Sequence, residues 1–134
     1  MAEVAFDWST ANPGSQRPFI EDTQHRHTAF VGGLGSGKSW SGAIKAVLCA
    51  IQHPNSLGLV CAPTYRQMRD STLREFMKLL PNELIASWNK SEYELKLVNG
   101  SEILFRSLEN YENVRGVEVA WIWIDEANLI SYKA

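Results

Sequence analysis

The chain has 134 residues, of which 45% are hydrophobic and 21% are charged, and its formal net charge at pH 7 is −2. This composition is typical of a globular protein with one domain and one core. It excludes a strong overall basic field, although a local basic patch for nucleic acid stays compatible with it. No apolar run approaches a membrane span and no secretory signal opens the chain, so we expect a cytoplasmic protein with reduced cysteines, Cys49 and Cys61.

The first 39 residues end in a recognisable loop motif. Residues 1–27 are polar and contain the turn signal Asn-Pro-Gly, so we expect an irregular segment there. Residues 28–31 (Thr-Ala-Phe-Val) are β-prone and predict a short strand. Residues 32–39 read Gly-Gly-Leu-Gly-Ser-Gly-Lys-Ser and fit the P-loop or Walker A pattern, G-x-x-x-x-G-K-[ST].

Each residue type in this loop has a chemical reason. The glycines allow a tight turn that points successive N–H groups at a phosphate. Lys38 would reach the β- and γ-phosphates of ATP, with a catalytic effect, and Ser39 would ligate Mg²⁺. The expected nucleotide-binding residues of the loop are Gly32, Gly33, Leu34, Gly35, Ser36, Gly37, Lys38 and Ser39.

The residues after the loop predict the helix that a P-loop requires. Apolar side chains recur at i, i+3, i+4, i+7, i+8 and i+11, which marks one helix face. They are Trp40, Ala43, Ile44, Val47, Leu48 and Ile51. The positive end of this helix dipole would point at the bound phosphate.

Gln16, upstream of the loop, is a candidate for recognition of adenine. A glutamine amide can both donate and accept hydrogen bonds at the adenine edge. The alternative interpretation is a surface loop residue, and Gln24 is a second candidate for the same role.

A second strand and helix follow. Residues 57–61 are a nearly continuous apolar run, which predicts a buried parallel strand. Thr64 is a good N-cap for a helix that we expect to reach about Leu80, before Pro81. Its expected core face holds Tyr65, Met68, Phe76 and Leu80, with Met77 beside them. Arg66 and Arg69 lie off that face, where they are either solvated or in contact with a nucleic-acid phosphate.

Alternating residues then predict a β-hairpin. Tyr93, Leu95 and Leu97 alternate with polar residues, Asn99-Gly100 is a turn signal, and Ile103 and Phe105 alternate on the return strand. We expect this hairpin to be inserted beside the parallel sheet and not to form part of it.

Residues 119–124 form an apolar strand that ends in Asp125-Glu126, the Walker B pattern. Asp125 would hold Mg²⁺, usually through water, and Glu126 would act as general base toward the attacking water. Such a base favours hydrolysis over phosphoryl transfer to a substrate. Trp121 and Trp123 point to one face of this strand, where we expect core packing.

Taken together, these segments resemble the ATPase domain of a large terminase subunit, the DNA-packaging motor of tailed phages. The matching segments occur in the same order over nearly the whole chain: residues 13–16, 32–39, 62–67, the hairpin around 99–100, 115–116 and 122–127. The resemblance implies an ATP- and Mg²⁺-dependent motor that moves double-stranded DNA in the host bacterial cytoplasm. Its implied partners are a portal protein, a small terminase subunit and further copies of itself in a ring, with no membrane.

The resemblance also suggests a role for Arg115. Carried over from the family, it would act as a trans finger that stabilises charge on the γ-phosphate of a neighbouring subunit's ATP. A surface loop residue is the alternative. Leu34 departs from the family, because many large terminases carry arginine at that place in the loop.

The implied fold is an α/β P-loop NTPase of the RecA-like (ASCE) type, with a mostly parallel sheet flanked by helices. In that fold, a strand that follows Walker B separates the P-loop strand from the Walker B strand. We therefore expect residues 1–134 to be the N-terminal part of an ATPase domain, truncated after Walker B, without nuclease activity and with slow or absent turnover. Two other hypotheses remain open: a helicase-like translocase, and a nucleotide-binding fragment without turnover.

Overall fold

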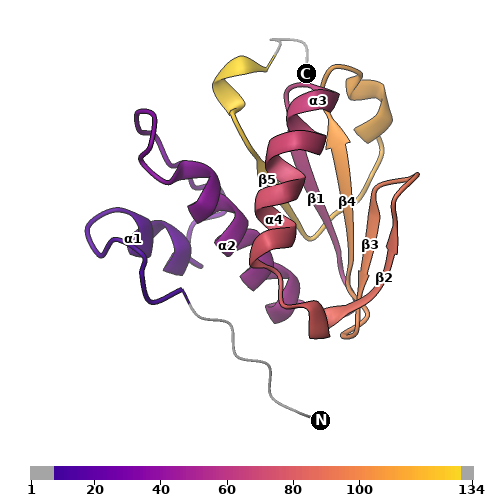
Figure 1. Ribbon diagram of the computed structural model, residues 1–134, viewed down its shortest axis with the longest axis horizontal. Coiled ribbons are helices and arrows are strands. Elements are labelled where there is room, and N and C mark those ends of the chain that lie inside the picture. Colours follow the sequence, from indigo (N-terminus) through magenta and orange to yellow (C-terminus); the bar gives the residue numbers. More distant parts are fainter. Residues whose placement is uncertain (1–7, 131–134) are drawn as a thin grey trace.

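The computed structural model describes residues 8–130, which form one mixed sheet with helices packed against it (Figure 1). The sheet has five strands in the order β2-β3-β4-β1-β5. Their bounds are β1 Leu57–Ala62, β2 Ile85–Asn89, β3 Glu94–Leu97, β4 Glu102–Ser107 and β5 Trp121–Ile124. β1 is parallel to β4 and β5, whereas β3 is antiparallel to β2 and β4. The predicted α/β class is confirmed.

Helix α2 (Lys38–Gln52) and the helical segment after β1 pack against the same side of the sheet. That segment comprises α3 (Tyr65–Gln67), the π-helical turn η1 (Met68–Thr72) and α4 (Leu73–Leu79). It begins where the sequence predicts, because the Thr64 hydroxyl accepts a hydrogen bond from the backbone N–H of Gln67. The shorter helices are α1 (Gln16–Glu21), η2 (Asn82–Leu84), η3 (Tyr111–Val114) and η4 (Ala127–Leu129).

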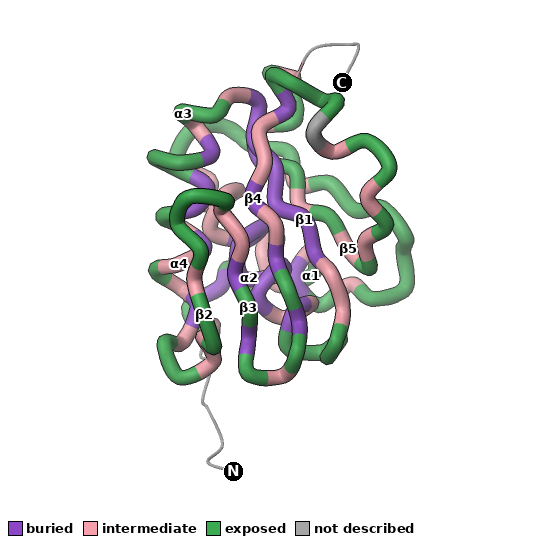
Figure 2. The backbone as a smooth tube through the Cα atoms, turned by 90° about the vertical axis from the view of Figure 1, so that its right-hand side faces the viewer, coloured by how far each residue is buried: buried purple, intermediate pink, exposed green. Residues whose placement is uncertain are grey.

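The core lies between these helices and the inner face of the sheet, and the buried residues concentrate in its central strands (Figure 2). Both tryptophans of β5 pack against this core, as predicted. They fit because two glycines leave room for their rings. A Cβ added to Gly42 would overlap the indole of Trp123, and one added to Gly58 would overlap that of Trp121. The contact at Gly42 brings β5 close to α2, and the contact at Gly58 lies on the neighbouring strand β1.

The hairpin prediction is right about the turn and wrong about the sheet. β3 and β4 pair around Gly100, which has a φ of 85°. However, β4 also pairs in parallel with β1, from Leu57 opposite Glu102 to Ala62 opposite Ser107. The hairpin is therefore an extension of the central sheet. An antiparallel edge on a parallel sheet is common, because the backbone hydrogen bonds of β4 can serve one neighbour of each orientation.

Three other predictions fail, two of them before α2 and one at the start of α3. Residues 28–31 form no strand, because no described segment pairs with them, and Val31 is 92% exposed. Gln16 to Glu21 form a short helix inside the segment expected to be irregular. Tyr65 is exposed instead of buried, because its ring lies against Tyr93 at the surface. Met68, Phe76 and Leu80 are buried as expected.

β5 borders β1 on one side, and no described residues pair with its other edge. Because residues 28–31 form no strand, the expected separation of the P-loop strand from the Walker B strand by a later strand stays a prediction. Ile122 and Ile124, on the face opposite the two tryptophans, are 54% and 44% exposed. This edge and face of the sheet are accessible in the described chain.

Candidate functional site

The P-loop turns from residues 28–31 into the first turn of α2. Two glycines adopt left-handed backbone conformations: Gly35 has a φ of 74°, and Gly37, the N-cap residue of α2, has a φ of 79°. A side chain at either position would be strained. The Ser36 backbone N–H donates to the carbonyl of Gly33 at 3.3 Å, which closes the turn. The loop sequence therefore curls around the N-terminus of α2, the positive end of its dipole.

The ammonium group of Lys38 lies inside this curl. Its Nζ atom donates to the carbonyls of Gly32 and Gly33, at 2.5 Å and 2.9 Å. The positive charge is thus held over the loop by backbone oxygens. An anion bound in the loop would meet this charge together with the N–H groups of the helix N-terminus.

The Walker A serine and the Walker B aspartate are in direct contact. Ser39 Oγ donates to Asp125 Oδ1 at 2.8 Å, although the residues are 86 positions apart in sequence. Asp125 follows β5, and its backbone N–H donates to the carbonyl of Cys61 on β1 at 2.9 Å. Only 6% of Asp125 is exposed. The hydroxyl oxygen of Ser39 and the carboxylate of Asp125 therefore lie together at the N-terminus of α2. Oxygen atoms of this kind are the ligands that a Mg²⁺ ion prefers.

A third residue completes this cluster. Thr72, in the π-helical turn η1, donates its hydroxyl to Asp125 Oδ2 at 2.8 Å. It is 1% exposed. Sequence reasoning missed it, because a threonine inside a helical segment belongs to no motif. A polar residue on the core face of that helix is the one signal that could have found it.

Glu126 lies beside this cluster with a strained backbone. Its backbone has a φ of 53° and a ψ of 45°, which lies in the left-handed region that residues other than glycine rarely adopt. Such strain costs on the order of 1–3 kcal/mol and concentrates at functional sites. Its side chain is half-buried, and no hydrogen bond joins its carboxylate to another described residue. The turn thus separates a hydrogen-bonded Asp125 from a carboxylate that is available to solvent.

Gln16 lies against the end of the P-loop. Its side-chain oxygen accepts from the backbone N–H of Asn12 at 2.7 Å, and its Nε2 atom is 3.5 Å from the carbonyl of Gly37. An open hollow of about 450 Å³ lies between α1 and the segment before the loop. Its lining residues include Ser15, Phe19 and Phe30. Gln24 is exposed, and its side chain makes no hydrogen bond with the described residues of the loop.

Lys45 ties the N-terminal segment to α2, a contact that the sequence did not reveal. Its Nζ atom donates to the carbonyls of Phe19 and Asp22, at 2.6 Å and 2.9 Å, and to the Thr28 hydroxyl at 3.2 Å. It also lies 4.8 Å from the centre of the Phe19 ring. Burial lowers the pKa of this lysine, and the charge of Asp22 opposes the shift. Lys45 therefore holds the end of α1 and Thr28 against α2.

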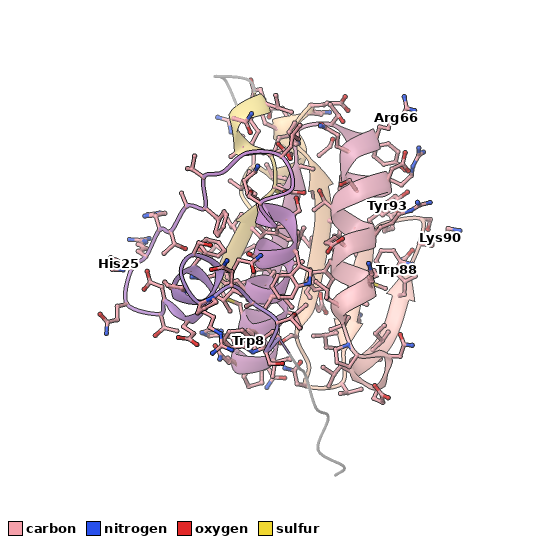
Figure 3. The ribbon with its side chains drawn as sticks, turned by 60° about the vertical axis from the view of Figure 1, so that its left-hand side comes forward. Trp8, His25, Arg66, Trp88, Lys90 and Tyr93 are labelled. Atoms are coloured by element: carbon pink, nitrogen blue, oxygen red, sulfur yellow. The ribbon has the colours of Figure 1, made fainter. Side chains whose placement is uncertain are left out.

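Arg115 makes no hydrogen bond or ion pair with the described residues of the P-loop. It follows η3 in the connection from β4 to β5, its side chain is 75% exposed, and its Nη1 atom is 3.5 Å from Glu112. Arg66 projects outward from the start of the helix after β1 (Figure 3) and lies 3.9 Å from Asp70. Arg69 pairs with Asp70 at 2.7 Å. Within the described residues, the structure brings none of these arginines to the site.

Within residues 8–130, no helix is long and apolar enough to cross a bilayer. The same residues contain no cluster of three or more histidine, cysteine, aspartate or glutamate side chains suited to a metal ion. A metal at this site would therefore rely on the serine–aspartate pair and on the ligands that a nucleotide brings.

Comparisons with known proteins point to one family. Residues 24–134 match the family model described as the phage terminase large subunit. A curated relative, the PBSX phage terminase large subunit of Bacillus subtilis (strain 168), is 28% identical over 120 residues. The match covers 86% of this chain and 27% of the relative. The chain thus spans less than a third of that relative's length.

Solved structures agree in fold. The large terminase ATPase domain of Thermus phage P74-26 matches with a TM-score of 0.59 and 24% identity, over 75% of this chain and 48% of that chain. A point variant of the same domain matches with a TM-score of 0.59 and 23% identity. These two likenesses establish the fold, that of a P-loop NTPase.

Proposed function

The chain belongs to the family of phage terminase large subunits, and on this premise we propose that it binds and hydrolyses ATP with Mg²⁺ to power the packaging of double-stranded DNA. The observation that carries the proposal is the hydrogen bond between Ser39 and Asp125. It joins the Walker A and Walker B motifs, which are 86 residues apart, into one site. The match to the family model over residues 24–134 favours this motor over the helicase-like alternative.

The first step is the binding of the triphosphate. The backbone N–H groups of residues 33–38 would surround the β-phosphate, and the N-terminus of α2 would add its positive dipole. Lys38 would exchange its bonds with the carbonyls of Gly32 and Gly33 for the β- and γ-phosphate oxygens. We assign Gln16 to the adenine, because its side chain lies at the end of the loop and the adjacent residue Ser15 lines an open hollow.

The residues present fit a magnesium ion. Ser39 Oγ and the Asp125 carboxylate would hold it, and it would neutralise charge on the β- and γ-phosphates. Asp125 stays anchored by the backbone of β1 and by Thr72. The serine and the aspartate are thus set in place before the nucleotide binds.

Hydrolysis requires a base for the attacking water, and we assign this role to Glu126. Its carboxylate would orient the water and accept its proton as the water oxygen bonds to the γ-phosphorus and the bond to the ADP oxygen breaks. The strained backbone and the absence of a hydrogen bond to another described residue support this assignment. Arg115 is proposed to act on the ATP of a neighbouring subunit, because its side chain is exposed and its ion-pair partner is Glu112, not a described residue of its own P-loop.

The proposed partners follow from the family. Double-stranded DNA, a portal protein, a small terminase subunit and further copies of the large subunit in a ring are the partners that a packaging motor requires. The setting would be the cytoplasm of the bacterial host.

A test of the function compares Glu126→Gln with Glu118→Gln, an exposed carboxylate in the connection that precedes β5. In a terminase that contains this domain, Glu126→Gln should bind ATP normally and lose hydrolysis by roughly 10²–10⁴-fold, because the general base is removed. Glu118→Gln should behave as the wild type. Equal turnover in all three proteins would remove Glu126 from the mechanism, and ATP binding without turnover in the wild type would favour the nucleotide-binding module.

A further inference from the structure

Asp125 is held by two hydroxyl groups, and the P-loop motif accounts for only one of them. Ser39 Oγ donates to Oδ1 and Thr72 Oγ1 donates to Oδ2, each at 2.8 Å. The two donors approach the carboxylate from different elements, α2 and η1. Because both carboxylate oxygens are engaged, the plane of the carboxylate is fixed.

Thr72 has no competing structural role for its hydroxyl. A threonine inside a helix often bonds back to the carbonyl four residues earlier, which here is Met68. That carbonyl already accepts the backbone N–H of Leu73, the bond that closes the π-helical turn. The Thr72 hydroxyl instead points at Asp125, and π-helical turns occur frequently at functional sites. Thr64, by contrast, uses its hydroxyl to cap the same helix.

The burial of this pair makes the hydrogen bond costly to lose. Thr72 is 1% exposed and Asp125 is 6% exposed, so little water reaches Oδ2. A buried carboxylate oxygen without a donor is unfavourable. Asp125 could then rotate to regain a partner, and rotation would turn Oδ1 away from Ser39.

We propose that Thr72 is a positioning residue that holds Asp125 in the orientation required for the magnesium ion of the Mg²⁺–nucleotide complex. The inference rests on the proposed function and adds a residue outside the Walker motifs. Residues that orient a metal-binding group typically contribute 10–100-fold, as an order of magnitude, to metal affinity. The expected effect is on the metal, because the hydroxyl of Thr72 bonds to Asp125 and makes no hydrogen bond with the P-loop backbone among the described residues.

The test measures how nucleotide binding depends on Mg²⁺. A fluorescent ADP, the N-methylanthraniloyl derivative, is titrated into the 134-residue chain in EDTA and at rising Mg²⁺ concentrations. Thr72→Val and Thr72→Ala remove the hydroxyl, whereas Thr72→Ser keeps it. Ser101→Ala serves as the matched control, because Ser101 is also 1% exposed and donates its hydroxyl to the carbonyls of Ala50 and His53, away from the site.

Thr72→Val and Thr72→Ala should raise the Mg²⁺ concentration for half-maximal binding by on the order of 10-fold, with unchanged binding in EDTA. Thr72→Ser should restore the wild-type value, and Ser101→Ala should keep it. Wild-type Mg²⁺ dependence in both hydroxyl-free variants, or the same shift in Ser101→Ala, would overturn the proposal. Failure of both variants to fold would also overturn it, because Thr72 would then be structural. A wild-type chain that binds no nucleotide would instead contradict the proposed function.

Discussion

At the scale of residues, the site combines side chains that a motif defines with side chains that only the fold reveals. Lys38, Ser39 and Asp125 were predictable, because the phosphate and metal chemistry fixes their types and spacing. Thr72 and Lys45 were not, because each acts through a partner that is distant in sequence. Arg115 stays a prediction: its side chain contacts Glu112 and no residue of the loop in the described chain.

The role of Arg115 in trans can be tested by mixing subunits. Arg115→Ala should spare ATP binding and reduce turnover in an assembled terminase, because the γ-phosphate of the neighbouring subunit loses a stabilising charge. Mixing it with Lys38→Ala subunits should restore part of the activity, since each variant supplies what the other lacks. ATP turnover of the mixture is compared with that of each variant alone. Absence of rescue would point to a role within one subunit.

Cys61 provides a residue-scale prediction for the core. It is 1% exposed, and burial raises the pKa of its thiol to about 12 from a reference value of 9.0, while the charge of Arg106 opposes the shift. The thiolate is therefore nearly absent at pH 8.5 in the folded chain. Alkylation by iodoacetamide should be much slower than in urea, as measured by mass spectrometry of the Cys61 peptide.

The same shift has a consequence for stability. The unfolded chain loses the thiol proton near pH 9 and the folded chain near pH 12, so ionisation favours the unfolded state between these values. The contribution of Cys61 to stability should be complete below pH 9 and decline as the pH rises. Rapid alkylation of the folded chain at pH 8.5 would show that the thiol is accessible and this account of its environment is wrong.

At the scale of elements, the packing of β5 on α2 depends on glycine. Gly42 lies inside α2, where alanine would normally stabilise a helix by about 1 kcal/mol. A Cβ at this position would overlap the Trp123 indole, so Gly42→Ala should instead destabilise the chain by about 1–3 kcal/mol. Urea denaturation measures the difference.

A second substitution isolates the cause. Trp123→Phe provides a smaller ring, so it should cost less stability in the Gly42→Ala background than in the wild type. The coupling between the two positions is obtained from the double-mutant cycle. Higher stability of Gly42→Ala than of the wild type would mean that helix propensity, and not the ring contact, dominates at Gly42.

The elements also mark the limit of sequence-based prediction. Periodicity and capping predicted α2, β1, the helix after Thr64 and the turn at Gly100, because each is encoded locally. The pairing of β4 with β1 is a tertiary choice that alternation cannot encode. Residues 28–31 have strand propensity without a described partner, and propensity alone does not make a strand.

At the scale of the whole molecule, the outer edge of β5 is one of the two edges of the sheet, and β2 forms the other. No described residues pair with the β5 edge, and Ile122 and Ile124 are exposed beside it. Unpaired edges promote strand pairing between copies. The 134-residue chain should therefore self-associate as its concentration rises, and Ile122→Lys should reduce this through charge repulsion. Sedimentation velocity measures both, with Val98→Lys, an exposed position on the hairpin, as control.

A monomeric wild-type chain at high concentration would contradict this prediction. So would equal self-association in Ile122→Lys and the wild type, because another surface would then be responsible. An effect of Val98→Lys equal to that of Ile122→Lys would point to charge in general and not to the β5 edge.

The central claim is that the P-loop and Asp125 form one Mg²⁺–nucleotide site, and the most direct measurement is the affinity of the chain for Mg²⁺–ATP by isothermal titration calorimetry. Lys38→Ala is compared with Lys90→Ala, whose lysine projects into solvent at the turn between β2 and β3 (Figure 3). We expect saturable binding in the wild type and Lys90→Ala, and loss of binding in Lys38→Ala, because the phosphate-facing charge is removed. Equal affinity in all three proteins would contradict the claim.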